Sequence, residues 1–163
     1  MSVRKDVRSL EEMRALGATL GSQLRKGDVV LLQGTLGAGK TSLVQGIGKS
    51  IGIDAITSPT FVISKSYPGL IHVDAYRLVG EPTALFDDLD LDSQMKEAAT
   101  VIEWGEGFVE RLTDEYLEVS IEFGKGEDLA INAFTEDIVK YFITECDYFE
   151  SMKREQPFVY NSL

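Results

Sequence analysis

The chain is poor in cysteine and histidine, and it has no long hydrophobic run. Its single cysteine, Cys146, excludes an internal disulfide and is typical of a reducing compartment. No stretch approaches the 18 apolar residues of a membrane-spanning helix. The N-terminal segment "MSVRKDVRSLEEM" lacks the apolar core of a signal peptide. These absences predict a cytoplasmic protein that does not contact a membrane.

Positive charge is scarce as well. The 163 residues include 16 lysines and arginines against 27 aspartates and glutamates, which gives a net charge of −11. A domain this acidic repels the phosphate backbone of a nucleic acid. We therefore expect little or no direct nucleic-acid binding by the chain alone.

The length and composition predict one domain that spans residues 1–163. Apolar residues make up 44% of the chain and charged residues 26%, which is typical of a globular protein. No internal repeat, low-complexity tract or Pro/Gly/Ser-rich linker divides the chain. A chain of this length can bury a substantial core.

Two helices and a buried strand are predicted in the first third of the chain. Ser9 and Glu12 form a capping box, and the apolar residues after them recur at helical spacing, so we expect a helix over residues 9–25. Residues 28–33, "DVVLLQ", lack polar alternation, as in a central strand that is buried on both faces. Residues 40–51 have one apolar face and predict a second helix.

The remaining pattern completes an α/β sheet. Further strands are predicted at residues 61–67, 70–74, 100–104 and 116–123. Pro68 and Gly69 mark a turn, and we expect the strand 116–123 to form an antiparallel hairpin with residues 128–134 at one side of the sheet. Short helical pieces are expected over 80–98 and 105–112, and a C-terminal helix over 135–152, followed by a tail. The predicted fold is that of a P-loop NTPase, with a mostly parallel sheet and helices on both faces.

The segment "GTLGAGKTS", residues 34–42, lies between the first predicted strand and the second helix. Four of its residues satisfy the phosphate-loop pattern G-x-x-x-x-G-K-[ST]: Gly34, Gly39, Lys40 and Thr41. Glycines let backbone N–H groups turn toward phosphate oxygens, and the helix N-terminus adds partial positive charge. The predicted nucleotide-binding residues are Gly34, Thr35, Leu36, Gly37, Ala38, Gly39, Lys40, Thr41 and Ser42. Lys40 would reach the β- and γ-phosphates, and the Thr41 hydroxyl would hold Mg²⁺.

Magnesium in such a site takes a second protein ligand, usually an acidic residue at a strand end. Asp74 closes the strand 70–74, and Glu103 lies near the end of the strand 100–104. The carboxyl edge of a parallel sheet is where ligands bind, so either residue fits this role. Trp104 follows Glu103 and is either part of the core or a lid over the nucleotide.

Two classes of phosphate-loop protein are disfavoured. Guanine-specific GTPases carry N-K-x-D, but the only asparagines, Asn132 and Asn161, do not start that motif. Small-molecule kinases usually place several arginines over the transferred phosphate, and only Arg77, Arg111 and Arg154 follow the loop. ATP is therefore the expected nucleotide. A small-molecule kinase and a non-hydrolysing, nucleotide-dependent scaffold remain as alternatives to an ATPase.

Four motifs in this order resemble the TsaE (YjeE/YdiB) family, the bacterial ATPase of tRNA threonylcarbamoyladenosine modification. They are "GDVVLLQGTLGAGKTS", "SPTF" at 58–61, "HVDAYRL" at 72–78 and "EWGE" at 103–106. The resemblance covers residues 9 to about 134. It implies ATP binding, slow hydrolysis and assembly with TsaB and TsaD, which transfer the threonylcarbamoyl group to an adenosine of tRNA.

The resemblance also implies roles for single residues. Thr41 and Glu103 would be magnesium ligands, and Trp104 would pack beside the site. Thr60 would be a switch-like residue near the γ-phosphate, and Asp74 would take part in hydrolysis together with Lys40.

The chain departs from the family pattern in several places. Thr35 stands where the family usually has Asp, and Ser42 and Met13 stand where it commonly has Thr. The departure at Met13 puts an adenine contact from that position in doubt. The tail from Thr135 onward is longer than usual for the family.

Overall fold

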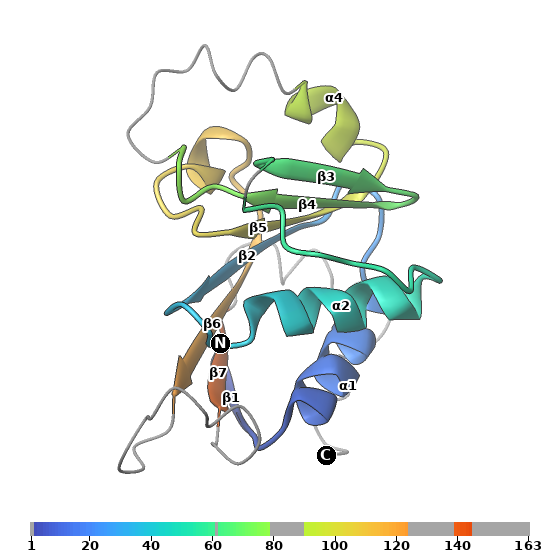
Figure 1. Cartoon of the computed structure of the whole chain (residues 1–163). Helices are drawn as coiled ribbons and strands as arrows, with labels where there is room; N and C mark the ends of the chain where they lie inside the picture. The colour runs from blue at the N-terminus through green and yellow to red at the C-terminus, as the bar shows by residue number, and fades with distance from the viewer. Residues whose placement is uncertain (1, 61, 79–89, 124–138, 145–163) are drawn as a thin grey trace.

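The computed structural model of the chain describes residues 2–60, 62–78, 90–123 and 139–144. These residues form a seven-stranded sheet with the order β1-β7-β6-β2-β5-β4-β3 (Figure 1). The strands are β1 (Ser2–Val7), β2 (Val29–Gly34), β3 (Ser64–Tyr67), β4 (Leu70–Asp74), β5 (Ala99–Glu103), β6 (Leu117–Phe123) and β7 (Val139–Thr144).

The centre of the sheet is parallel, because β2 pairs in parallel with β5 and with β6, and β4 pairs in parallel with β5. β3 and β7 run antiparallel to their neighbours. Every residue of β4 and β5 is buried, as expected for strands that are covered on both faces. The predicted α/β class with a mostly parallel sheet is confirmed.

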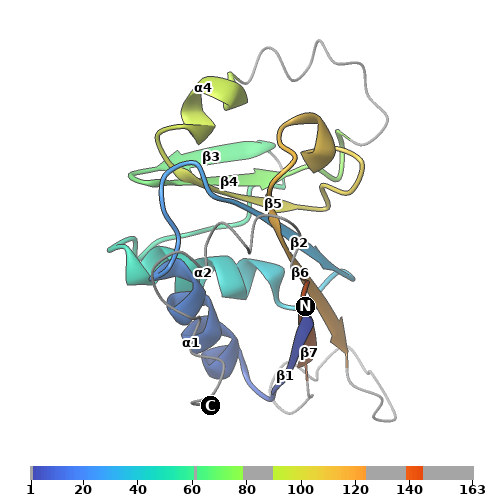
Figure 2. The same cartoon turned by 180° about the vertical axis from the view of Figure 1, so that it is seen from behind.

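Helices cover both faces of the sheet, as predicted. α1 (Leu10–Gly21) and α2 (Lys40–Ser50) lie next to each other on one face (Figures 1 and 2). The other face packs against α4 (Leu91–Met95) and the 3₁₀ turn η1 (Val109–Arg111). The predicted helix over 105–112 is thus a single turn. No helix within the described ranges is long and apolar enough to cross a membrane.

Two predicted local motifs are present in the structure. Ser9 caps α1, its hydroxyl accepting from the backbone N–H of Glu12 at 3.1 Å, and α1 ends at Gly21 rather than at residue 25. β3 and β4 form an antiparallel hairpin in which Tyr67 pairs with Leu70. Gly69 has φ of 82°, a conformation that favours glycine at the end of a Pro-Gly turn.

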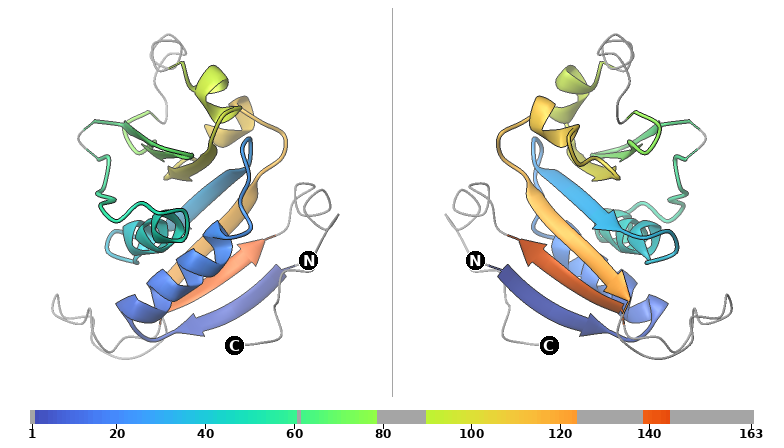
Figure 3. Two further views of the ribbon diagram at one scale, coloured as in Figure 1. Left: turned by 90° about the vertical axis from the view of Figure 1, so that its right-hand side faces the viewer. Right: turned by 90° about the vertical axis from the view of Figure 1, so that its left-hand side faces the viewer.

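The predicted C-terminal helix is wrong over Val139–Thr144, which form β7 between β1 and β6 (Figure 3). The helical spacing of apolar residues there was misleading, because a short apolar run does not distinguish a helix from a buried strand. The segment "VKYFIT" is rich in β-branched and aromatic residues, which favour strands. The rest of that predicted helix, the tail, and the predicted strand 128–134 lie outside the described residues.

The sequence interpretation also missed β1, which pairs antiparallel with β7 at the edge of the sheet. Its segment "SVRKDV" contains three charged residues and lacks the apolar alternation of a half-buried strand. Charged residues are common on edge strands because they oppose pairing with other molecules.

The contact between α1 and α2 depends on two buried glycines. A Cβ atom on Gly17 would lie 2.1 Å from the carbonyl oxygen of Leu43, and a Cβ on Gly46 would lie 2.1 Å from that of Arg14. Both distances are far below van der Waals contact, so the two helix backbones touch at these positions. Because α2 begins at the phosphate loop, this contact also positions the loop.

Replacing Gly46 with alanine should therefore push α1 and α2 apart. We expect a loss of about 1–3 kcal/mol in the free energy of unfolding, as for other overpacked sites. Chemical denaturation would measure it, with Lys49→Ala as the control, because Lys49 is exposed on the same helix and should change stability by no more than about 0.5 kcal/mol. Equal midpoints for the two variants would contradict the close contact.

Candidate functional site

The segment between β2 and α2 has the backbone of a phosphate loop. Gly37 and Gly39 have φ of 80° and 101°, values that side chains rarely allow. Gly39 is also the N-cap of α2, and no side chain caps the helix there. The first N–H groups of α2 therefore have no partner within the helix or its cap, and they are available to an anion. Gly34 lies so close to β6 that a Cβ would come within 2.6 Å of the Ile121 carbonyl oxygen.

Lys40, the first residue of α2, holds its amino group inside this loop. Nζ donates to the carbonyl oxygens of Gly34 at 2.7 Å and Thr35 at 3.0 Å, and it lies 3.9 Å from the ring centre of Trp104. The residue is only 5% exposed. Burial lowers the pKa of Lys40, and the carboxylates of Glu103 and Asp74 oppose that shift. The loop thus carries a cation beside two buried acids.

Those two acids, Asp74 and Glu103, end neighbouring parallel strands, as the sequence predicted. Asp74 and Glu103 are partners in the register of β4 and β5, and Leu32 of β2 is the partner of Glu103 on its other side. The two acids are 5% and 4% exposed. Parallel register brings both carboxylates to the carboxyl edge of the sheet, where β2 leads into the phosphate loop.

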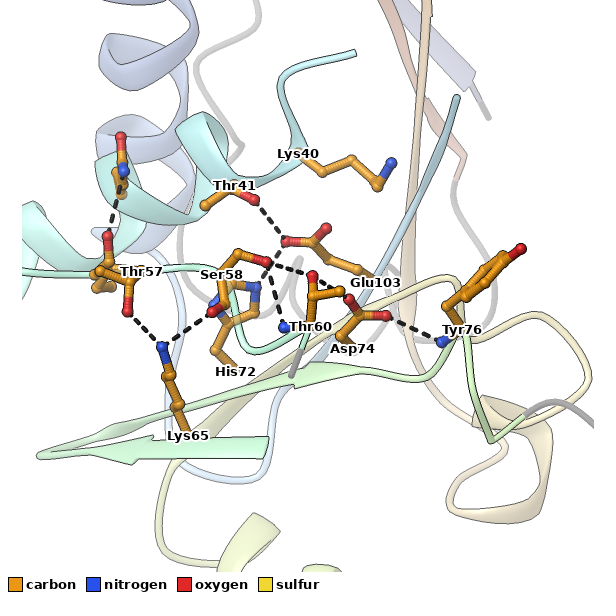
Figure 4. Close-up of polar contacts among 12 residues, drawn as sticks. Lys40, Thr41, Thr57, Ser58, Thr60, Lys65, His72, Asp74, Tyr76 and Glu103 are labelled. Atoms are coloured by element: carbon orange, nitrogen blue, oxygen red, sulfur yellow. Dashed lines mark hydrogen bonds and ion pairs between the residues drawn. The ribbon is translucent and has the colours of Figure 1, made fainter. Parts of the chain in front are cut away.

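Glu103 contacts α2 and β4 through one oxygen. Its Oε1 accepts from the Thr41 hydroxyl at 3.3 Å and lies 2.7 Å from Nε2 of His72 (Figure 4). A hydroxyl and a carboxylate are the hard oxygen ligands that Mg²⁺ prefers. The described residues contain no cluster of three or more histidine, cysteine or acidic side chains able to hold a metal. Thr41 and Glu103 therefore fit a cation that completes its shell with phosphate oxygens and water, and not one caged by protein.

Asp74 binds a different segment, residues 57–60. Its Oδ2 accepts from the Thr60 hydroxyl at 2.7 Å, and its Oδ1 accepts from the backbone N–H of Tyr76 at 3.0 Å. The Thr60 hydroxyl also lies 2.7 Å from that of Ser58 (Figure 4). Asp74 thus joins the end of β4 to the loop in which the sequence predicted a switch-like residue.

Three further side chains hold this loop and the residue before it, Ile56, from outside. Lys65 of β3 donates to the Ser58 carbonyl oxygen at 2.9 Å, and Gln45 of α2 donates to that of Ile56 at 3.2 Å. The guanidinium of Arg77 donates to the Thr60 carbonyl oxygen. The loop is therefore tied to both α2 and the β3–β4 hairpin.

Most of the predicted site residues surround one cleft of about 200 Å³. Its lining consists of Leu10, Leu36, Gly37, Gly39, Lys40, Thr41, Ser42, Ser58, Thr60, Asp74, Glu103 and Trp104. Gly34, Thr35 and Ala38 are outside this lining. Gly34 and Thr35 contribute the carbonyls that hold Lys40, and Ala38 is buried.

Two lining residues, Leu10 and Ser58, were not among the predicted site residues. Leu10 starts α1 and has the spacing of an ordinary core position, so no local signal distinguished it. Ser58 stands in "SPTF", next to the predicted Thr60, and its place in that motif could have identified it. Met13 is buried against Gly39, 3.3 Å from a Cβ built there, so it supports the end of the loop and does not face the cleft.

Trp104 forms one wall of the cleft. Its ring also contacts Tyr76 edge to face, with centroids 5.6 Å apart and planes at 69°. Its backbone has φ of 60°, which is rare for a bulky residue. Tyr76 is 66% exposed, so this aromatic pair extends from the buried cation to the surface of the protein.

Comparison with known proteins adds independent evidence. A family model described as "Threonylcarbamoyl adenosine biosynthesis protein TsaE" matches residues 7–130. The chain is similar to proteins named tRNA threonylcarbamoyladenosine biosynthesis protein TsaE from two bacteria. Identity is 48% to that of Streptomyces coelicolor over 122 residues (71% of this chain, 82% of the relative) and 36% to that of Bacillus subtilis over 118 residues (69% and 72%).

The fold is similar as well. The crystal structure of YdiB from Bacillus subtilis superimposes with a TM-score of 0.67 and 25% sequence identity, covering 94% of this chain and 95% of YdiB. The sequence matches and the shared fold agree with each other. The chain therefore belongs to the TsaE family of threonylcarbamoyladenosine biosynthesis proteins.

Proposed function

We propose that this protein is a cytoplasmic subunit that binds and hydrolyses ATP with Mg²⁺ for the threonylcarbamoyladenosine modification of tRNA. One observation carries the proposal. The phosphate loop, its lysine and two buried carboxylates surround a single cleft at the carboxyl edge of the sheet. Phosphate transfer needs little covalent chemistry from a protein, and it depends mainly on positioned cations and donors.

Each group in the cleft has a separate task in this proposal. The N–H groups of the loop and Lys40 bind the phosphates, and Thr41 and Glu103 hold the magnesium ion, whose positive charge offsets that of the phosphates. Asp74 and Thr60 line the same cleft, where they orient the attacking water. Trp104 closes one wall and excludes solvent from the phosphates.

The proposed partners are TsaB and TsaD. The relatives' names support a place in the tRNA modification pathway. The net charge of −11 favours an action through partner proteins, because so acidic a domain repels tRNA. ATP hydrolysis in this protein would then turn over a complex in which other subunits hold the tRNA.

Purified protein should bind TsaB and TsaD in a pull-down in an ATP-dependent manner, and the complex should release inorganic phosphate from ATP. Labelled γ-phosphate would follow the product. Its appearance on a small molecule would indicate a kinase, and complex formation without phosphate release would indicate a non-hydrolysing scaffold. Absence of any ATP-dependent complex would contradict the proposed partnership.

A further inference from the structure

One buried polar side chain at the site has no task in the function proposed above. His72, the only histidine of the chain, is 0% exposed in the middle of β4. It lies two residues before Asp74, so the two side chains share the face of the sheet that α2 covers. On the neighbouring strand, its register partner is Val101, two residues before Glu103. His72 therefore reaches diagonally across the strand pair to the carboxylate.

The contact of His72 with Glu103 determines which carboxylate oxygen is left for the cleft. Nε2 lies 2.7 Å from Oε1, the oxygen that also accepts from Thr41. The other oxygen lies on the side of Lys40 (Figure 4). We propose that His72 is a positioning residue that locks this orientation of Glu103 and so prepares it to hold the magnesium ion. The inference rests on the proposed function of the cleft.

The hydrogen bonds of the ring show which of its nitrogens holds Glu103. A carboxylate only accepts, so the ring must carry a hydrogen on Nε2 to bond with Oε1. Nδ1 is buried and has no hydrogen-bond partner in the part of the chain that the structure describes. Among the described residues, the ring therefore bonds only to Glu103, through a single donor with one direction.

Packing alone does not explain a histidine at this position. A buried nitrogen without a partner destabilises the fold, whereas a leucine of similar size would fill the same space at no such cost. Apart from His72, all residues of β4 before Asp74 are apolar. A leucine could not make the hydrogen bond that the imidazole makes with Glu103. Removing such a hydrogen bond to a metal ligand typically lowers the metal affinity by about 10–100-fold.

The test is a magnesium titration of ATP binding by wild-type protein and the variants His72→Leu and His72→Gln. His72→Leu should raise the magnesium concentration for half-maximal binding by about 10–100-fold. It should leave the weak ATP affinity measured in EDTA unchanged. His72→Gln is the matched control, because its amide Nε2 can donate at the same reach, and it should restore the wild-type titration to within about threefold.

The double variant separates positioning from general packing. If His72 acts through Glu103, adding His72→Leu to Glu103→Ala should shift the titration by less than about twofold. An equal shift in both backgrounds would overturn the inference, as would a wild-type titration in His72→Leu. A defect that is equally large in EDTA would show that His72 serves packing only. If ATP binding by the wild-type protein does not depend on the magnesium concentration, the proposed function is refuted instead.

A second measurement needs neither ATP nor magnesium, and it applies even if His72→Leu does not fold. Because His72 is the only histidine, the nitrogen spectrum of untagged, ¹⁵N-histidine-labelled protein reports on this ring alone. We expect a hydrogen on Nε2, whose nitrogen resonance shifts in Glu103→Gln. A ring without a hydrogen on Nε2, or one that is unaffected by Glu103→Gln, would overturn the inference.

Discussion

Replacing Lys40 with alanine should abolish ATP binding while leaving the fold intact. The lysine amino group is buried at the cleft wall and lies within the phosphate loop. A hydrogen bond to a charged group contributes about 1.5–3 kcal/mol. The loss of one such contact raises the dissociation constant about 10–150-fold. The loss of contacts to both the β- and γ-phosphates would raise it further. Isothermal titration calorimetry with ATP and Mg²⁺ would measure the loss.

The folding of this variant should be close to that of the wild type. The carbonyl groups of Gly34 and Thr35 lose their donor, but Lys40 itself lines the cleft, so water can enter the space that its shortened side chain leaves and bond to them. Lys49→Ala is the matched control, because it removes the same charge from the exposed far end of α2 and should keep wild-type affinity. Wild-type ATP affinity in Lys40→Ala would refute the phosphate-loop interpretation.

The parts of the site that lie in short motifs could be predicted from the sequence. The glycine conformations and the bonds of Lys40 to Gly34 and Thr35 all lie within one contiguous motif, so the motif alone is enough to predict them. Asp74 and Glu103 are distant in the chain, but each ends a strongly apolar strand. In a parallel sheet such ends meet at one edge, so their proximity followed from pattern alone.

The contacts between these residues could not be predicted in the same way. The bond from His72 to Glu103 spans 31 residues of sequence and depends on the register of β4 and β5. The hydrogen bonds from Gln45 to Ile56 and from Arg77 to Thr60 depend on how α2 and the hairpin pack. Periodicity identifies strands and helices, but it does not determine register or rotamer.

The outer strands show a different limit. β1 and β7 come from opposite ends of the described chain and pair with each other. Neither has a local pattern that decides for a strand, because β1 is charged, and in β7 the apolar spacing fits a helix although the composition favours a strand. The sheet provides the missing information: β7 satisfies the open edge of β6, and β1 then covers the edge of β7.

The contacts of Glu103 and Asp74 predict different defects when each is replaced. Glu103 bonds with Thr41, the other candidate magnesium ligand, and with His72. Asp74 bonds with Thr60 and with the backbone of Tyr76, and makes no such contact with Thr41 among the hydrogen bonds of the described residues. One acid is thus attached to the cation side of the cleft and the other to the loop 57–60. These separate contacts indicate that the two acids have different functions.

Glu103→Ala should raise the magnesium concentration needed for tight ATP binding by about 100-fold or more, because removing even an outer partner of a metal ligand costs about 10–100-fold. Its affinity for ATP in EDTA should stay near that of the wild type. Glu103→Gln is the control for folding, since its amide has the same size and can still accept from Thr41.

Asp74→Asn should instead slow hydrolysis while leaving ATP affinity nearly intact. The asparagine oxygen can still accept from the backbone of Tyr76, and its amide can donate to the Thr60 hydroxyl, so the loop keeps its place while the negative charge is lost. Loss of a group that orients or deprotonates water typically costs about 10²–10⁴-fold in rate. Single-turnover phosphate release, paired with the magnesium titration, measures both variants. If the two variants show each other's defects, the two roles are assigned the wrong way round. If neither variant differs from the wild type, the proposed roles of both acids are wrong, but the phosphate loop can still be a nucleotide site.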